Sequence, residues 1–177
     1  MADYVTDGKI GIDLTAIYAS TSAGSTSLFP AKSGDMVSTT NNGRYIFARA
    51  ESTVAQYDAV IFSTFGDSAS ATPVLRAVPI TTTNAAALGY NMVGFAQVAV
   101  TSAYYGWFCI NGVVKVNLLV ACQPKVPLYT TATAGSLDDT TVSAGYVVGI
   151  VANTSATSAS APYCVASWPH LITSNPV

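Results

Sequence analysis

Charged residues are scarce in this sequence of 177 residues. Only 9% of the residues are Asp, Glu, Lys or Arg, and 50% are hydrophobic, whereas about a quarter of the residues of a soluble domain are usually charged. The ranges 77–114 and 140–177 contain no charged residue. Because so little charge cannot cover the surface of a free monomer, we expect the chain to bury much of its surface against copies of itself or a large partner.

Other absences disfavour further classes of function. The seven Lys and Arg residues are scattered and the net charge is −2, so the basic surface that holds nucleic acid is missing. No unbroken apolar run of about 18 residues occurs, so no membrane-spanning segment is expected. The cysteines Cys109, Cys122 and Cys164 are far apart and odd in number, which predicts buried thiols rather than disulfides. The first residues do not resemble a secretion signal, so we expect assembly in a reducing cytoplasm.

Residues that support catalysis or bind a cofactor form no recognisable pattern. The single histidine, His170, has no partners for a zinc site or for a catalytic base. Neither a nucleophile elbow nor a Gly-rich phosphate loop occurs. The carboxylate pair Asp138 and Asp139 lacks the alternating spacing of a calcium loop, and a turn after Gly135 is the favoured interpretation. We therefore expect no enzyme activity, no cofactor and no metal.

The sequence does contain the pattern of β-strands. Two-residue alternation and β-branched residues recur between clusters of Gly, Asn, Pro and Ser, and helix signals are confined to one short turn near 83–89. Single strands are expected at 59–64, 73–80, 92–100, 127–130, 145–152 and 163–168. Several have apolar residues on both faces, as in 146–151, so a sandwich or a neighbouring subunit must cover both sides. The pattern predicts an all-β domain over residues 31–170, an antiparallel β-sandwich or β-barrel.

Two hairpins are predicted from turns that contain Asn and Gly. The first joins strands at 36–39 and 44–50 through Asn41, Asn42 and Gly43. The second joins strands at 104–110 and 113–120 through Asn111 and Gly112, because this dipeptide tolerates the two positive φ angles of a type I′ turn.

The ends of the chain differ from this domain. Residues 1–30 are predicted to form an extended N-terminal arm, and residues 171–177 a shorter C-terminal tail. Spaced apolar residues of the arm are candidates for contacts with a partner: Ile12, Leu14, Ile17, Tyr18, Leu28 and Phe29. A terminus without fixed contacts is an equal alternative.

An aromatic patch lies in the first strand of the second predicted hairpin. Tyr104, Tyr105 and Trp107, followed by Phe108, are candidates for partner binding or for stacking on sugars. Packing in the core or in an interface is the default interpretation of such a patch.

Eight sequence segments together carry a resemblance to a known class of protein. They are GRYIFARAE (43–51), YDAV (57–60), VGFAQVA (93–99), YGWF (105–108), GVVKV (112–116), PLYTT (127–131), AGSLDD (134–139) and VGIV (148–151). Their order resembles the capsid decoration, or cement, proteins of tailed bacteriophages over residues 35–152. The resemblance implies a β-barrel or sandwich that forms homo-oligomers, often trimers, on the outside of the shell and binds across joints between major capsid subunits.

The leading hypothesis is therefore a structural virion protein at the capsid surface, assembled in the cytoplasm of the host bacterium. Its expected partners are the major capsid protein and copies of itself, with a trimer favoured over a dimer. The alternative is a head or tail fibre module that binds host-surface glycans through the aromatic patch. A cellular β-rich enzyme or surface protein with an unusual site is a third hypothesis, and the sequence offers no site for it.

Overall fold

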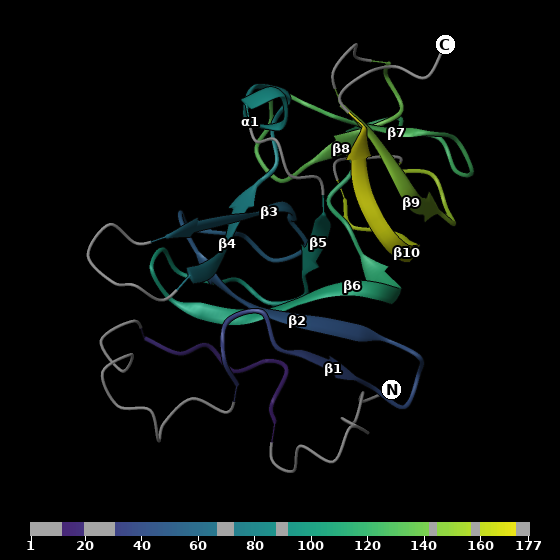
Figure 1. Ribbon diagram of the computed structural model, residues 1–177. Helices are drawn as coiled ribbons and strands as arrows, with labels where there is room; N and C mark the ends of the chain where they lie inside the picture. Colours follow the sequence, from purple (N-terminus) through teal and green to yellow (C-terminus); the bar gives the residue numbers. More distant parts are fainter. Residues whose placement is uncertain are drawn as a thin grey trace.

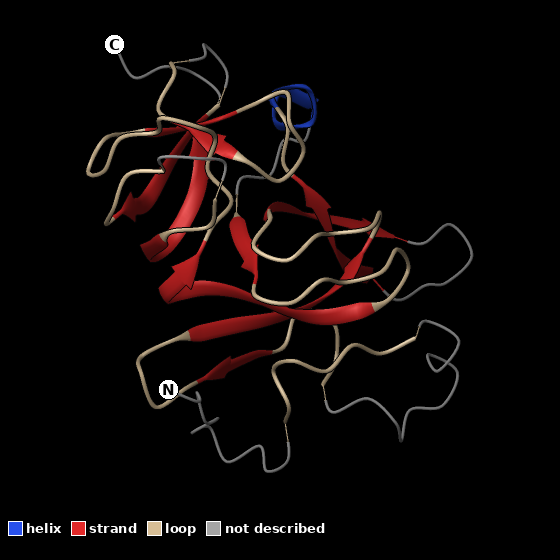
Figure 2. Ribbon diagram, turned by 180° about the vertical axis from the view of Figure 1, so that it is seen from behind, coloured by secondary structure: helices blue, strands red, loops and turns tan. Residues whose placement is uncertain are grey.

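The computed structural model describes residues 12–19, 31–66, 73–87, 92–141, 145–156 and 160–172. Within them the chain forms ten strands and one short helix, α1 (Thr82–Ala87), and the loops and strands dominate the molecule (Figure 2). The prediction of an all-β protein is confirmed. The strands are β1 (Met36–Ser38), β2 (Arg44–Ala50), β3 (Ala59–Gly66), β4 (Pro73–Pro79), β5 (Val93–Ala96), β6 (Tyr105–Lys115), β7 (Leu128–Thr130), β8 (Leu137–Asp138), β9 (Tyr146–Ala152) and β10 (Tyr163–Ile172).

Five strands close into a barrel, so the prediction of a sandwich or barrel resolves to a barrel. The order around the ring is β2, β4, β3, β5 and β6, and β6 returns to pair with β2. The closing pair is antiparallel and sets Phe47 opposite Trp107. Within the ring, β2 and β4 run parallel and the other neighbours are antiparallel. The parallel pair is possible because β3 lies between β2 and β4 in the sequence and brings the chain back to the end of the barrel where β2 began.

The other strands extend the sheet beyond the barrel. β10 pairs with the second half of β6, β9 pairs with β10, and β7 and β8 complete this second sheet. β1 pairs with the start of β2. Figure 1 shows β6 running along the barrel and on into the second sheet. One long strand therefore belongs to both parts of the molecule.

The hairpin predicted at Asn111 and Gly112 is wrong, because both residues lie inside the 11-residue strand β6. The pairing register with β2 shifts between the pairs Arg44–Asn111 and Tyr45–Cys109, which leaves one extra residue on β6, as in a β-bulge. Gly112 has a φ of 113°, and β6 passes from β2 to β10 at this point. The tolerance of glycine for positive φ is thus used for a bend in one strand rather than for a turn between two.

The hairpin predicted around Asn42 is confirmed. β1 and β2 are antiparallel, with Met36 opposite Ile46, and Asn42 has a φ of 58° in the connecting turn. At the other end of the chain, β10 continues to Ile172. The predicted C-terminal tail is therefore wrong for Leu171 and Ile172, which lie in a strand, and Leu171 is fully buried.

Two clusters of apolar side chains lie on opposite sides of the barrel strands. On β2, Ile46 and Ala48 belong to the cluster inside the barrel, whereas Tyr45 and Phe47 belong to a larger cluster outside it. The larger cluster continues beneath the second sheet, where it includes Leu171. Because consecutive residues of a strand point to opposite faces, the barrel strands need apolar residues on both faces, as their sequences show.

Candidate functional site

The aromatic patch predicted from the sequence is mostly internal. Trp107 is fully buried and its ring lies 4.9 Å from that of Phe47, centroid to centroid. Tyr105 is also buried, and its ring stacks on that of Phe47 at 5.6 Å, centroid to centroid. The half-buried Tyr104 packs against the cluster inside the barrel. Because Trp107 is fully buried, it has no surface with which to contact a partner. The default interpretation, packing in the core, describes its position.

The described part of the predicted arm lies along the barrel. Ile12, Leu14 and Tyr18 are half-buried and pack against the larger cluster. The Tyr18 backbone N–H donates to the Tyr105 carbonyl at 2.9 Å, and the Tyr105 N–H donates back to the Tyr18 carbonyl at 2.8 Å. Figure 1 shows this purple segment beside the barrel.

Two of the predicted arm residues lie outside the described residues: Leu28 and Phe29. Ile17 is 42% exposed, so among the described arm residues it presents the most apolar surface to a partner.

An apolar row on the second sheet was not predicted. Val165 of β10 lies opposite Val113 of β6 on one side and opposite Val151 of β9 on the other. These three side chains, with Tyr163 two residues before Val165, are 44–63% exposed. We call the four residues the outer face.

The opposite side of the same strands is buried, as at Cys164 and Ala166. Eight large apolar side chains of the described residues are exposed, and four of them form the outer face. Scattered exposed apolar residues need no explanation, but a contiguous apolar patch is typical of an interaction surface. The alternation in 163–167 was a signal for this face, but only the topology aligns it with Val113 and Val151.

Two cations border the outer face, and both lie over aromatic rings. The Arg44 guanidinium is 5.9 Å from the centre of the Trp168 ring. The Lys115 ammonium lies between two rings, 5.3 Å from that of Tyr57 and 5.2 Å from that of Tyr163. Such cation–π contacts hold a positive charge in place without neutralising it.

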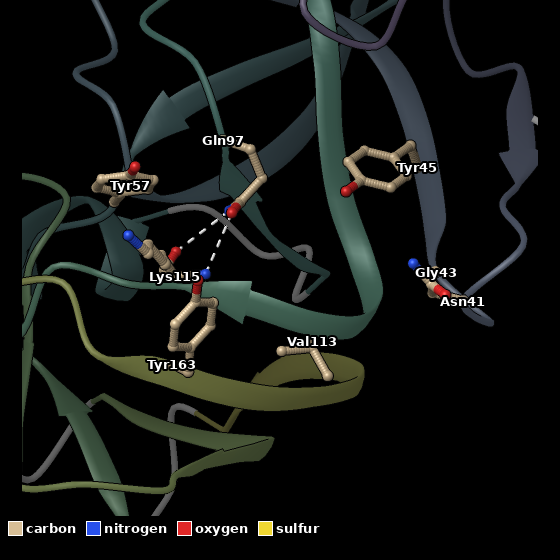
Figure 3. Close-up of a pocket in the computed structure, with 8 residues that line it drawn as sticks. All are labelled: Asn41, Gly43, Tyr45, Tyr57, Gln97, Val113, Lys115 and Tyr163. Carbon is tan, nitrogen blue, oxygen red and sulfur yellow. Dashed lines mark hydrogen bonds between the residues drawn. The ribbon is translucent and has the colours of Figure 1, made fainter. Parts of the chain in front are cut away.

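A groove of about 670 Å³ adjoins the outer face at Lys115. Figure 3 shows Tyr57 and Tyr163 on either side of Lys115 and the sharp bend of β6 that brings Val113 to the groove. Three tyrosines, two amides and one cation line it, and no carboxylate of the described residues does; the lining residues are Asn41, Gly43, Tyr45, Tyr57, Gln97, Val113, Lys115 and Tyr163.

The Gln97 side chain closes one wall of this groove. Its Nε2 donates to the Lys115 carbonyl at 3.2 Å, and its Oε1 accepts from the Lys115 N–H at 3.1 Å (Figure 3). This amide occupies the place of a neighbouring strand, so both backbone groups of Lys115 are satisfied.

A buried carboxylate fixes the turn that carries Tyr57. Asp58 Oδ2 accepts from the Ala55 N–H at 2.8 Å, and Oδ1 accepts from the Asn117 side chain at 3.0 Å. Burial raises the pKa of Asp58, and these two hydrogen bonds oppose the shift. Tyr57 itself has a φ of 70°, and its N–H donates to the Ala96 carbonyl at 2.7 Å. The wall of the groove is therefore held by several independent contacts.

One group of potential metal ligands occurs among the described residues. The ligand atoms of Cys122, Asp138 and Asp139 lie within 4.8 Å of one another. Burial, and then the two carboxylates, raise the pKa of Cys122 to about 11, so the thiol is protonated near neutral pH. Asp139 accepts from the Gln123 N–H at 2.9 Å, and Asp138 lies in β8, so both carboxylates lie in a structured part of the chain.

Comparisons with known proteins give a structural likeness. No protein family matches the sequence, and no curated protein matches it. The fold is similar to that of the head fiber gp8.5 N base in bacteriophage phi29, with a TM-score of 0.48 and 16% identity. The similarity covers 72% of this chain and 97% of that chain. Within the described residues, no helix has the length and apolar character needed to cross a membrane.

Proposed function

We propose that this chain is a structural protein of a tailed-phage virion that binds the outer capsid surface and stabilises contacts between major capsid subunits. The observation that carries the proposal is the outer face, where Val113, Val165 and Val151 form one exposed row across three strands. The scarcity of charge and the resemblance of the sequence to capsid decoration proteins support it. No catalytic role is part of the proposal.

The outer face suits permanent contact with a protein shell. Its valines are rigid and contribute no charge, so little side-chain entropy and no charge desolvation oppose their burial. A modest interface is sufficient, because a protein that spans several capsid subunits gains from each contact at once. We expect the free protein to be a homo-oligomer, with a trimer favoured over a dimer.

The test is co-sedimentation with undecorated phage shells. Val165→Lys places a charge in the centre of the outer face at a position that is 44% exposed, so the fold tolerates it. Burial of the half-exposed valine contributes about 1 kcal/mol, and burial of the lysine charge opposes docking further, so shell affinity should fall at least about tenfold. Val120→Lys is the matched control, because Val120 is 60% exposed but lies outside the three-strand row.

Two measurements then decide between outcomes. Light scattering gives the mass of the free protein and of Val165→Lys, and thermal melting gives the stability of shells with and without the bound protein. Shells that are equally stable without it, or a Val165→Lys variant that binds them normally, would contradict the proposal. A variant that loses self-association but still binds shells would assign the outer face to contacts between copies instead.

The fibre alternative was based on the aromatic patch around Trp107. Since Trp107 is fully buried, stacking of a glycan on that side chain has no structural support. Any glycan site has to be sought elsewhere on the molecule.

A further inference from the structure

We propose that the groove around Lys115 is a binding site for an acidic saccharide, with the ammonium of Lys115 contacting the sugar carboxylate and Tyr163 stacking on the sugar ring. This inference goes beyond the shell-binding role, which rests on the valine row of the outer face. It concerns mainly Tyr57, Gln97, Lys115 and Tyr163, and of these four residues Tyr163 also belongs to the outer face.

The first argument is that the Lys115 ammonium is held in place without an ion pair among the described residues. Its ammonium lies between the rings of Tyr57 and Tyr163 at 5.3 and 5.2 Å, and within the described residues no carboxylate forms an ion pair with it. The rings restrict where the ammonium lies, while its charge stays available. A charge placed in this way, in a groove that no described carboxylate lines, favours an anionic ligand.

The second argument is the mixture of groups around that charge. The tyrosine rings present flat faces of negative potential, which attract the C–H groups on the apolar face of a pyranose. Tyrosine hydroxyls can pair with sugar hydroxyls, and the Gln97 amide, which bonds the Lys115 backbone, keeps one N–H and one oxygen lone pair for the same purpose. Because Tyr163 is 57% exposed, its ring has surface that Lys115 does not cover.

Two other classes of anionic ligand fit less well. A nucleic acid needs several cations along its path, but only Lys115 among the lining residues is charged. An acidic peptide that adds a strand needs an open strand edge. At Lys115 that edge is closed, because Gln97 occupies both backbone groups and Tyr163 of β10 lies on the other side.

The test uses the full chain and two small probes that differ in one group, methyl β-glucuronide and methyl β-glucoside. Chemical-shift titration by NMR should give millimolar binding of the glucuronide, with shifts at Tyr57, Val113 and Lys115. The glucoside should bind about tenfold more weakly, which is the usual size of one charge-assisted hydrogen bond. Added salt should reduce this preference, because the ammonium is partly exposed to solvent.

Variants separate the contribution of the Lys115 charge to sugar binding from that of the Tyr163 ring. Lys115→Gln should abolish the preference for the glucuronide, and Tyr163→Ala should weaken both sugars. Lys125→Gln is the control, since Lys125 is exposed and does not line the groove, and it should bind like the natural sequence. Val165→Lys should also keep glucuronide binding, so the result is independent of shell docking.

Three outcomes would overturn the inference. They are no groove shifts with either sugar, equal binding by Lys115→Gln and the natural sequence, and sodium acetate binding as tightly as the glucuronide. The last outcome would show that the groove binds simple anions and does not recognise a saccharide.

Discussion

The bend of β6 at Gly112 gives the sharpest prediction about the fold. A Cβ atom on Gly112 would lie 2.9 Å from the Gly43 Cα atom and 3.4 Å from the Gly43 nitrogen. Both contacts are with backbone, which cannot move aside as a flexible side chain does. Gly112→Ala therefore combines a strained positive φ with a steric clash between β6 and the turn that follows β1.

Gly34 separates these two contributions. It also has a positive φ, 89°, but a Cβ atom there meets nothing within 4 Å. A non-glycine residue at such a φ costs about 1–3 kcal/mol, and Gly→Ala reduces the entropy of the unfolded chain by the same amount at either position. The difference between the variants is thus the clash, for which overpacking data suggest about 1–3 kcal/mol.

The measurement is urea unfolding, followed by tryptophan fluorescence from the buried Trp107 and the half-exposed Trp168, together with thermal melting. For a chain of this size each 1 kcal/mol lowers Tm by about 2–4 °C. We expect Gly112→Ala to lose about 2 kcal/mol more than Gly34→Ala, and Gly112→Val to lose more again because a β-branched residue adopts positive φ poorly. Equal losses in Gly112→Ala and Gly34→Ala would refute the close contact between β6 and Gly43.

Two further predictions concern the arm and the thiols. Tyr18→Ala removes the edge-to-face contact with Phe47, centroid distance 5.9 Å, and should lower the free energy of unfolding by about 2 kcal/mol. Ile17→Ala, at the exposed neighbouring residue, should change the free energy of unfolding by less than about 0.5 kcal/mol. Equal effects of the two variants in urea unfolding would contradict the docking of the arm. Burial raises the pKa values of Cys122 and Cys164 to about 11 and about 12, so the stability from their neutral thiols is present below pH 9 and is lost between about pH 9 and 12. Urea midpoints at pH 8 and pH 10.5 should therefore differ less in Cys164→Ala than in the natural sequence, and an identical difference would contradict the shift.

Local sequence patterns predicted the strands well because strand and turn chemistry is local. The hairpin at Asn42 is correct since its two strands pair directly with each other. The same dipeptide at Asn111 and Gly112 was misleading, because Asn–Gly reports only a tolerance for positive φ. Whether the chain turns back or bends depends on what lies alongside. Here β6 pairs first with β2 and then with β10. No local sequence pattern contains that information.

Burial was the second point that the sequence left open. An aromatic patch has the same sequence pattern whether it packs in the core or contacts a partner. Closure of the barrel is what sets Trp107 against Phe47. The groove could not be predicted from the sequence for a related reason. Tyr57, Gln97, Lys115 and Tyr163 come from four separate segments, so their proximity depends on the order of strands in the sheet.

The bend of β6 links the core to both proposed surfaces. Before the bend, β6 closes the barrel and places Trp107 in the core; after it, the same strand presents Val113 to the outer face and Lys115 to the groove. The Asn111 side chain donates to the Asn42 carbonyl at 2.9 Å, so the turn between β1 and β2 supports the bend from outside. Because Val113 directly follows Gly112, a substitution that straightens β6 must displace the valine row and the wall of the groove together. Gly112→Ala should therefore weaken shell and glucuronide binding in parallel even while the chain stays folded, whereas Val165→Lys should weaken shell binding alone.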